Sequence, residues 1–191
     1  MVLCCAGGGR KEGEDVWSDL SNAAYTGNVA RMMQQINTGS SVNGADQNGL
    51  TPLHRAAQSG SFAALQLLLK NGADPRCSAK NGDTPLHIAA FHRNAEAVKF
   101  LLSTDAKVDI NKQTKDHGMT PLHVAVYRGC PEIVDLLLAA GADPDLLAKG
   151  QTAVNLAEFW DTQESQGRSS PSAKHHDTLL LLQTRLKKAT L

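Results

Sequence analysis

Apolar residues recur at helical spacing in three similar stretches of the chain, 62–69 (FAALQLLL), 95–102 (AEAVKFLL) and 131–138 (PEIVDLLL). Each stretch predicts a short amphipathic helix. Residues 53–60 (LHRAAQSG) predict another short helix, which Gly60 can end in a left-handed cap. The pattern therefore predicts paired short helices. Because one such pair cannot bury its apolar face alone, successive pairs are expected to stack.

The helix pairs belong to a repeat of roughly 33 residues. The phrase TPLH begins at Thr51, Thr84 and Thr120, with spacings of 33 and 36 residues. Thr152 lies 32 residues further on, and Ser18 lies 33 residues before Thr51. These five positions are the reference positions of the five units. A threonine followed by proline is typical of a helix start, because the hydroxyl caps free amides and proline suits the first turn.

The repeated Thr-Pro-Leu-His phrase resembles the ankyrin repeat family over roughly residues 17–160. The resemblance implies an all-α solenoid with short β-hairpin-like fingers and a C-terminal capping helix. A flexible tail is expected at 1–16, a polar inserted loop at 161–176 and the capping helix at 177–191, where Leu179, Leu180 and Leu182 would cover the last core face. The expected units lie near 17–47, 48–80, 81–115, 116–148 and 149–160.

The third unit departs from the pattern at two places. Arg93 stands where sister units have Gly27, Gly60 and Gly129, which predicts a strained left-handed residue. The unit is also three residues longer than the second, across the segment 105–117. Two interpretations stay open for this segment: a protruding finger that helps select a partner, or a neutral insertion in a surface loop.

Composition excludes several classes of function. The 19 basic and 19 acidic residues balance, which argues against binding nucleic acid through bulk charge. No apolar run approaches the ~20 residues that span a bilayer, and the first residues lack a signal-peptide pattern. The four cysteines form no CxxC pair or disulfide framework. We therefore expect a cytoplasmic or nuclear protein that is monomeric on its own.

Catalytic, metal and cofactor sites are not indicated by the sequence. No nucleophile–base pair is visible, and AGGG at 6–9 lacks the GK[ST] of a phosphate loop. His54, His87 and His123 recur at the repeat period, and the resemblance implies a structural role for them. His175 and His176 are expected in the solvated loop, without ligand partners. We expect no enzyme activity, cofactor, metal or small-molecule substrate.

Two kinds of modification are conceivable near the ends. Adjacent Cys4 and Cys5 could accept palmitate and tether the chain to a membrane, or they could be free thiols in a flexible tail. Ser169 and Ser170 could be phosphorylated beside Arg168, or they could belong to a plain loop.

The resemblance implies that a partner protein meets the fingers and the exposed face of the first helices. The aromatic residues seven positions after the reference predict a ladder of Phe91, Tyr127 and Phe159, although Phe159 and Trp160 could instead pack under the C-terminal helix. Arg55, His92 and Arg128 suggest a partner segment with apolar and acidic residues. The function expected is a non-catalytic adaptor or stoichiometric regulator, and the alternative is a membrane-tethered scaffold. The candidate partner-binding residues are Tyr25, Arg55, Gln58, Ile88, Phe91, His92, Lys112, Lys115, Asp116, His117, Met119, Tyr127 and Arg128.

Overall fold

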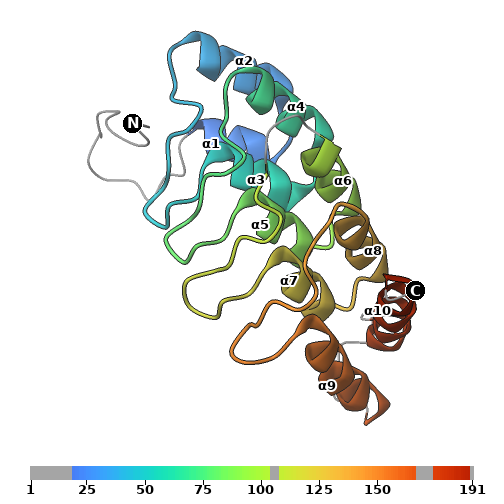
Figure 1. The fold of residues 1–191 in the computed structure, drawn as a ribbon. Helices are drawn as coiled ribbons and strands as arrows, with labels where there is room; N and C mark the ends of the chain where they lie inside the picture. The colour runs from blue at the N-terminus through green and yellow to red at the C-terminus, as the bar shows by residue number, and fades with distance from the viewer. Residues whose placement is uncertain (1–18, 104–107, 167–173, 190–191) are drawn as a thin grey trace.

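The computed structural model describes residues 19–103, 108–166 and 174–189, and the helices stack in two rows as the repeat predicts (Figure 1). The first helices of the units form one row and the second helices form the other, each packing on the next member of its row. Within the described ranges the helices are α1 (Asp19–Tyr25), α2 (Val29–Asn37), α3 (Pro52–Ser59), α4 (Phe62–Lys70), α5 (Pro85–Phe91), α6 (Ala95–Ser103), α7 (Pro121–Tyr127), α8 (Pro131–Ala139), α9 (Ala153–Ser165) and α10 (His175–Ala189).

The core consists of columns of equivalent residues that run along the stack. Two positions after each of the first four references, Leu20, Leu53, Leu86 and Leu122 are buried. Six positions after each of the first four references, Ala24, Ala57, Ala90 and Val126 are fully buried, and small side chains let neighbouring first helices approach closely. The apolar faces of the helices are thus covered by the next unit, which confirms the expected all-α solenoid.

A histidine joins each central unit to the finger of the next unit. In α5, the His87 ring accepts a hydrogen bond from the Thr84 amide at Nδ1 (3.3 Å) and donates from Nε2 to the Met119 carbonyl (3.0 Å). His54 and His123 make the same two contacts in their own units. The histidines expected to be structural therefore cap their helices and tie consecutive units together.

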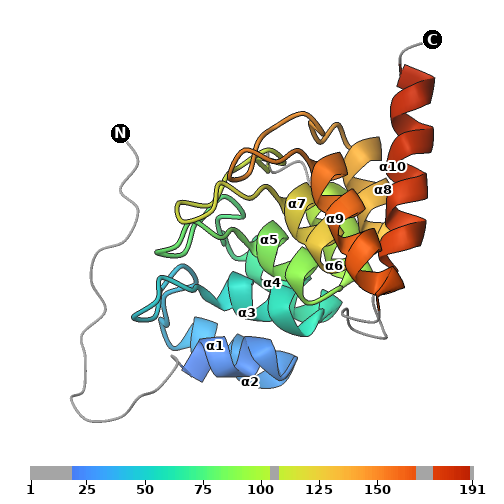
Figure 2. The same ribbon diagram turned by 90° about the horizontal axis from the view of Figure 1, so that it is seen from below.

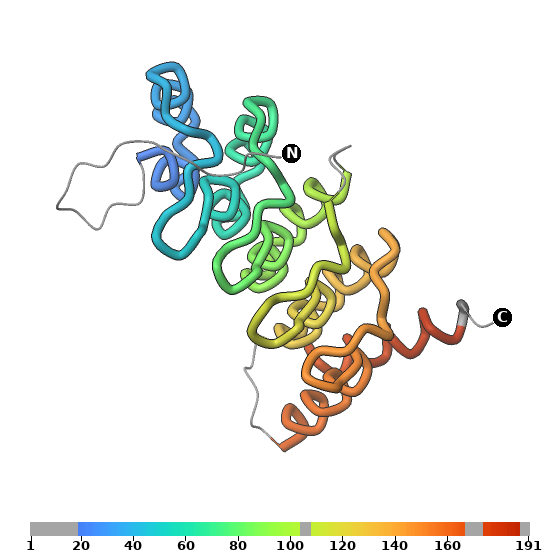
Figure 3. The backbone as a smooth tube through the Cα atoms, turned by 60° about the vertical axis from the view of Figure 1, so that its left-hand side comes forward, coloured from blue at the N-terminus to red at the C-terminus, as the bar shows by residue number. Residues whose placement is uncertain are grey.

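The fingers are linked side by side through the backbone (Figure 3). The Lys80 amide donates to the Asn48 carbonyl (2.9 Å), and the Lys115 amide donates to the Asn81 carbonyl (2.8 Å). These bonds align the hairpin turns along one edge of the stack. In the described residues the fingers form no regular strand, and one isolated bridge joins Ala148 to Gln151.

The three extra residues of the segment 105–117 are divided between the fourth finger, which is one residue longer than its neighbours, and the stretch before it. The bond that closes the turn joins residues 46 and 50 in the second finger and 79 and 83 in the third, but 114 and 119 in the fourth. A second marker lies upstream: Asn111 accepts from the Asp143 amide as Asn43 accepts from the Asp74 amide. Asn43 precedes its reference by eight residues and Asn111 by nine, so the other two extra residues lie before Asn111. Residues 104–107 of that stretch lie outside the described residues.

Arg93 adopts the left-handed conformation that the sequence predicts. Its φ is +62°, and Gly27, Gly60 and Gly129 have positive φ in the sister units. The Arg93 side chain donates from Nε to Cys130 Sγ of the next unit, at 3.1 Å. This contact across the unit boundary accompanies a backbone conformation that would suit glycine better.

The C-terminal end differs from the expected boundaries. Helix α9 continues to Ser165 and α10 begins at His175, so the polar loop predicted at 161–176 is shorter at both ends. Helix α10 packs against α8 and α9 (Figure 2), as the second helix of a fifth unit would. Leu182 is fully buried there, whereas Leu180 is 50% exposed and does not cover the core.

His175 is buried, contrary to the expectation that it is solvated. Its Nε2 donates to the Tyr127 carbonyl (3.2 Å), and its amide donates to Glu164 Oε2 (2.8 Å). Asn94 makes the equivalent contact two units earlier, from its side chain to the Gln58 carbonyl (2.8 Å). His175 therefore takes the place of this asparagine and fixes the start of α10 on the fourth unit. His176 is exposed.

Candidate functional site

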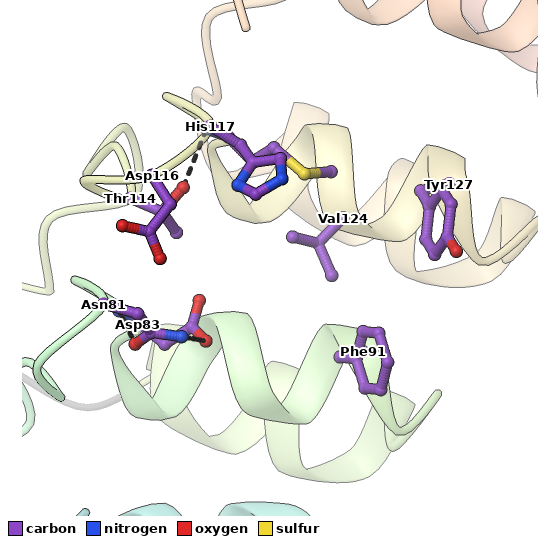
Figure 4. A pocket seen from close by; sticks show the side chains of 9 residues that line it. Asn81, Asp83, Phe91, Thr114, Asp116, His117, Val124 and Tyr127 are labelled. Carbon is purple, nitrogen blue, oxygen red and sulfur yellow. Dashed lines mark hydrogen bonds between the residues drawn. The ribbon is translucent and has the colours of Figure 1, made fainter. Parts of the chain in front are cut away.

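A pocket of about 360 Å³ lies between the third and fourth units, on the side that carries the fingers (Figure 4). Helices α5 and α7 form its floor, and the third and fourth fingers form its rim. Its lining residues are Asn81, Asp83, Phe91, Thr114, Asp116, His117, Met119, Val124 and Tyr127. Five of these, Phe91, Asp116, His117, Met119 and Tyr127, are residues that the sequence places on the partner surface.

The pocket has an apolar end and a polar end (Figure 4). At the apolar end, Phe91 and Tyr127 project from neighbouring helices and are 43% and 41% exposed. Large apolar side chains exposed side by side are typical of an interaction surface. Val124 and Met119 continue this apolar lining toward the fingers. The pocket therefore offers a partner a hydrophobic contact next to polar groups.

Two carboxylates mark the polar end, where Asp83 and Asp116 lie opposite one another (Figure 4). Asn81 holds Asp83 by donating from Nδ2 to Oδ2 (2.7 Å). In the part of the chain that the structure describes, neither carboxylate forms an ion pair. The polar end thus carries negative charge that no basic side chain of the described chain neutralises.

His92 and Arg128 flank the apolar end as the sequence predicts. The Arg128 guanidinium carbon lies 4.7 Å from the centroid of the Phe91 ring, in a cation–π contact. The His92 ring meets Phe91 edge-on, with 5.4 Å between centroids. Burial, followed by the charge of Arg128, lowers the pKa of His92, so its imidazole is neutral at pH 7. Arg128 is then the fixed positive charge at this end.

Arg55 does not belong to an open contact surface, which corrects the sequence interpretation. Its side chain is buried and donates to Asp46 Oδ2 (2.8 Å) and Gln58 Oε1 (3.0 Å). Both members of the Arg55–Asp46 ion pair are only about a tenth exposed. The sequence could not reveal this pairing, because Asp46 lies on a finger nine residues away.

The other candidate residues lie around the pocket or away from it. Ile88 and Gln58 are half-buried. Lys115 on the fourth finger and Lys112 just before that finger are exposed and do not line the pocket. Tyr25 is exposed at the end of α1, three units from α7. Cys4, Cys5, Ser169 and Ser170 lie outside the described residues.

The aromatic ladder continues through Trp160 and not through Phe159. Tyr127 meets Trp160 edge-on with 5.3 Å between centroids, and Trp160 stacks on the buried His175 ring at 5.6 Å. Phe159 is 49% exposed. The alternative from the sequence is that Phe159 and Trp160 both pack under the C-terminal helix. Only Trp160 does so, through its contact with His175 at the start of α10.

Four lining residues are not among the candidate partner-binding residues: Asn81, Asp83, Thr114 and Val124. One signal was available for Asp83, because the position before the reference holds Leu50, Met119 and Gln151 in the other fingers. A charge at a position that is otherwise uncharged indicates a local role. Thr114 accepts from the Met119 amide (3.0 Å) and so shapes the longer turn, which sequence spacing alone does not predict.

The repeated histidines do not gather into a metal site. Burial lowers the pKa of His54 to about 4 and also lowers the pKa of His87 and His123. Each ring accepts at Nδ1 and donates at Nε2, which is the neutral form. Across the described residues, no three His, Cys, Asp or Glu side chains are grouped so that they could hold one ion.

Over the described residues, no helix has both the length and the apolar character needed to cross a bilayer.

Comparison with known families agrees with this architecture. No individual curated protein matches the chain. A family model for ankyrin repeats in three copies matches residues 65–148, and a second, for ankyrin repeats in many copies, matches residues 33–89. The capped helix pairs, the stacked fingers and these two overlapping matches together show that the chain belongs to the ankyrin repeat family.

Proposed function

We propose that this protein binds a segment of another protein in the pocket between its third and fourth units, as a non-catalytic adaptor or stoichiometric regulator. Ankyrin repeats are generally protein–protein interaction modules. The observation that carries the proposal is the pocket itself, where two adjacent aromatic side chains remain more than 40% exposed beside unpaired carboxylates. Aromatic residues are frequent hot spots of protein interfaces.

The framework around the pocket favours binding without large rearrangement. A backbone hydrogen bond joins the two fingers at the rim of the pocket to one another. The hydrogen bond from His87 to the Met119 carbonyl fixes the fourth finger to helix α5 at the floor. A surface that is already ordered loses little conformational entropy when a partner binds. The proposed mechanism is therefore docking of a partner segment onto a preformed surface.

The experiment that tests the proposal compares partner capture by the wild-type chain and by Phe91→Ala/Tyr127→Ala. Phe62→Ala is the matched control, since Phe62 is 50% exposed but lies on α4, in the row of second helices (the outer row). We expect the double variant to lose a partner that the wild type and the control retain, with thermal unfolding close to that of the wild type. Equal capture of every partner by all three proteins would place the binding surface elsewhere.

The alternative function, a membrane-tethered scaffold, rests on the adjacent thiols Cys4 and Cys5. Acylation of both would supply the two hydrophobic signals that stable anchoring requires. Fractionation of the Cys4→Ser/Cys5→Ser variant tests this alternative. An unchanged distribution between membrane and supernatant would dismiss it, and a shift to the supernatant would support it.

A further inference from the structure

We propose that the polar end of the pocket accepts an arginine side chain of the partner, next to an apolar residue that covers Phe91 and Tyr127. This inference deepens the proposed function and rests on it. It differs from the partner segment with apolar and acidic residues that Arg55, His92 and Arg128 suggest in the sequence, since Arg55 is buried in an ion pair with Asp46.

The second unit shows how an arginine lies in this part of the fold. Arg55, four positions after its reference, reaches toward the finger of its own unit and donates to Asp46, a finger carboxylate. Its other terminal nitrogen donates to Gln58, seven positions after the reference. The side chain is only 9% exposed, so the space between first helix and finger accommodates a whole guanidinium.

The fourth unit offers the same space without the arginine. Val124 stands at the position of Arg55, and its side chain is too short to reach a finger. Thr114 stands at the turn position of Asp46, because its amide donates to the Met119 carbonyl as the Asp46 amide donates to the Leu50 carbonyl. The finger carboxylate of this unit is Asp116, two residues further along the finger, and Tyr127 stands at the position of Gln58. The pocket between helix and finger is lined by Val124, Asp116 and Tyr127, together with Asp83 from the unit before. An arginine supplied by the partner would thus enter a space like the one that Arg55 fills in the second unit, with Asp83 and Asp116 as its acceptors in place of Asp46.

Charge complementarity favours a cation at this end. Asp83 and Asp116 line the pocket, and no lysine or arginine of the described residues forms an ion pair with either. The basic groups of this region lie elsewhere: Arg128 covers Phe91 at the apolar end, and Lys115 is exposed outside the pocket lining. The other lining residues with ionisable side chains are His117 and Tyr127.

Arginine fits the site better than lysine for two reasons. Its planar, forked guanidinium can bond two carboxylates at once, whereas an ammonium is a point charge with a stronger hydration shell. Its flat face also stacks on aromatic rings, as Arg128 already does on Phe91 in this structure. The apolar stem of an arginine would lie along Val124 and Met119.

The experiment selects peptides from a displayed random 12-residue library on four forms of the full chain: wild type, Asp83→Asn/Asp116→Asn, Phe91→Ala/Tyr127→Ala, and Asp145→Asn/Glu158→Gln. The last variant is the charge-matched control, because both of its residues are exposed and neither lines the pocket. Selected peptides are then synthesised, and their Kd values are measured against each form together with thermal unfolding of the protein.

We expect wild-type and control selections to be enriched in peptides with an arginine close to an apolar residue. Loss of two charge-assisted bonds should weaken binding of these peptides to Asp83→Asn/Asp116→Asn about ten-fold or more. Replacing the arginine by glutamine in the peptide should have a similar effect on the wild type and little effect on that variant.

Failure of this inference is distinguishable from failure of the proposed function. Peptides that need Phe91 and Tyr127, but show no arginine enrichment and bind Asp83→Asn/Asp116→Asn equally well, would overturn the arginine site and leave the binding surface in place. Peptides that bind Phe91→Ala/Tyr127→Ala as tightly as the wild type would overturn both.

Discussion

At the residue scale, a few side chains have structural roles that their positions in the repeat do not predict. Arg55 and Val124 occupy equivalent positions, yet one fills the space beneath its finger and the other leaves a pocket. His54, His87 and His123 are equivalent in both position and role, each neutral and bonded on both ring nitrogens. Residues with the same role in successive units, such as the histidines, build the stack. Residues that differ between equivalent positions, such as Arg55 and Val124, determine where a pocket forms.

The three buried histidines predict that stability falls as the pH is lowered from 7 to 5. Their folded-state pKa values lie below the ordinary value of 6.5, so the unfolded chain binds more protons in this range. The stabilisation is fully present above that value and is lost as the pH falls toward the folded pKa. Each histidine contributes a slope of up to about 1.4 kcal/mol per pH unit to the free energy of unfolding.

Urea unfolding at pH 7 and pH 5 measures this dependence. The matched pair of variants is His54→Gln, which should weaken the pH dependence, and His117→Gln, which should not, because His117 is exposed on the finger. An identical free energy of unfolding at the two pH values in the wild type would contradict the interpretation.

The equivalence of Val124 and Arg55 predicts that Val124→Arg blocks the pocket from within. The new guanidinium should enter the pocket that Asp83 and Asp116 line, and binding of an arginine-containing peptide should weaken about ten-fold. Fluorescence anisotropy with a labelled peptide provides the measurement, and Val124→Leu is the control. Undiminished binding by a folded Val124→Arg protein would argue against the equivalence.

At the element scale, the fingers depend on close contacts between backbones. Gly82 has a φ of +90°, and a Cβ atom added to it would lie 2.8 Å from the Lys115 amide nitrogen. That amide donates to the Asn81 carbonyl and joins the third finger to the fourth. The same two fingers form the rim of the pocket, so their alignment matters for the site as well as for the fold.

Gly82→Ala should therefore destabilise the protein more than Gly72→Ala. Gly72 has a similar φ of +83°, but a Cβ atom there would meet nothing within 4 Å. We expect a loss of about 1 kcal/mol for Gly72→Ala from backbone strain, and a further 1–2 kcal/mol or so for Gly82→Ala from the disrupted finger contact. Equal losses in urea unfolding would mean that the finger contact contributes no stability.

At the scale of the whole molecule, the stack must close its ends, and α10 closes the C-terminal one. Leu182 is fully buried on it, while Arg185 forms an ion pair with Asp135 of α8 at the solvent edge. His175 fixes the start of the helix on the Tyr127 carbonyl, so the cap and the pocket share the fourth unit.

Leu182→Ala should cost about 2–5 kcal/mol of stability, since it leaves a cavity in the terminal core. Leu180→Ala is the control, because Leu180 is 50% exposed on the same helix, and its change should stay within roughly 0.5 kcal/mol. Thermal and urea unfolding distinguish the two. A similar small loss for both variants would show that α10 does not cap the core.

The repeat predicted most of the fold, because helix starts, glycine caps and apolar spacing are local signals. The same signals placed Phe91 and Tyr127 beside one another. Contacts between distant residues were not predictable in this way: the burial of Arg55 by Asp46, the position of His175 under Tyr127, and the approach of Asp83 to Asp116 each depend on how units stack. These contacts determine which charged side chains line the site, so the proposed partner chemistry depends on contacts that the sequence does not reveal.

The most direct test of the central claim is site-specific photo-crosslinking of the protein to its partner. A benzophenone side chain is introduced in place of Tyr127, in the pocket, or in place of Phe62, on the outer row. The account predicts a crosslinked partner from position 127 and none from position 62. Crosslinking from position 62 alone would show that the partner binds the opposite layer of helices.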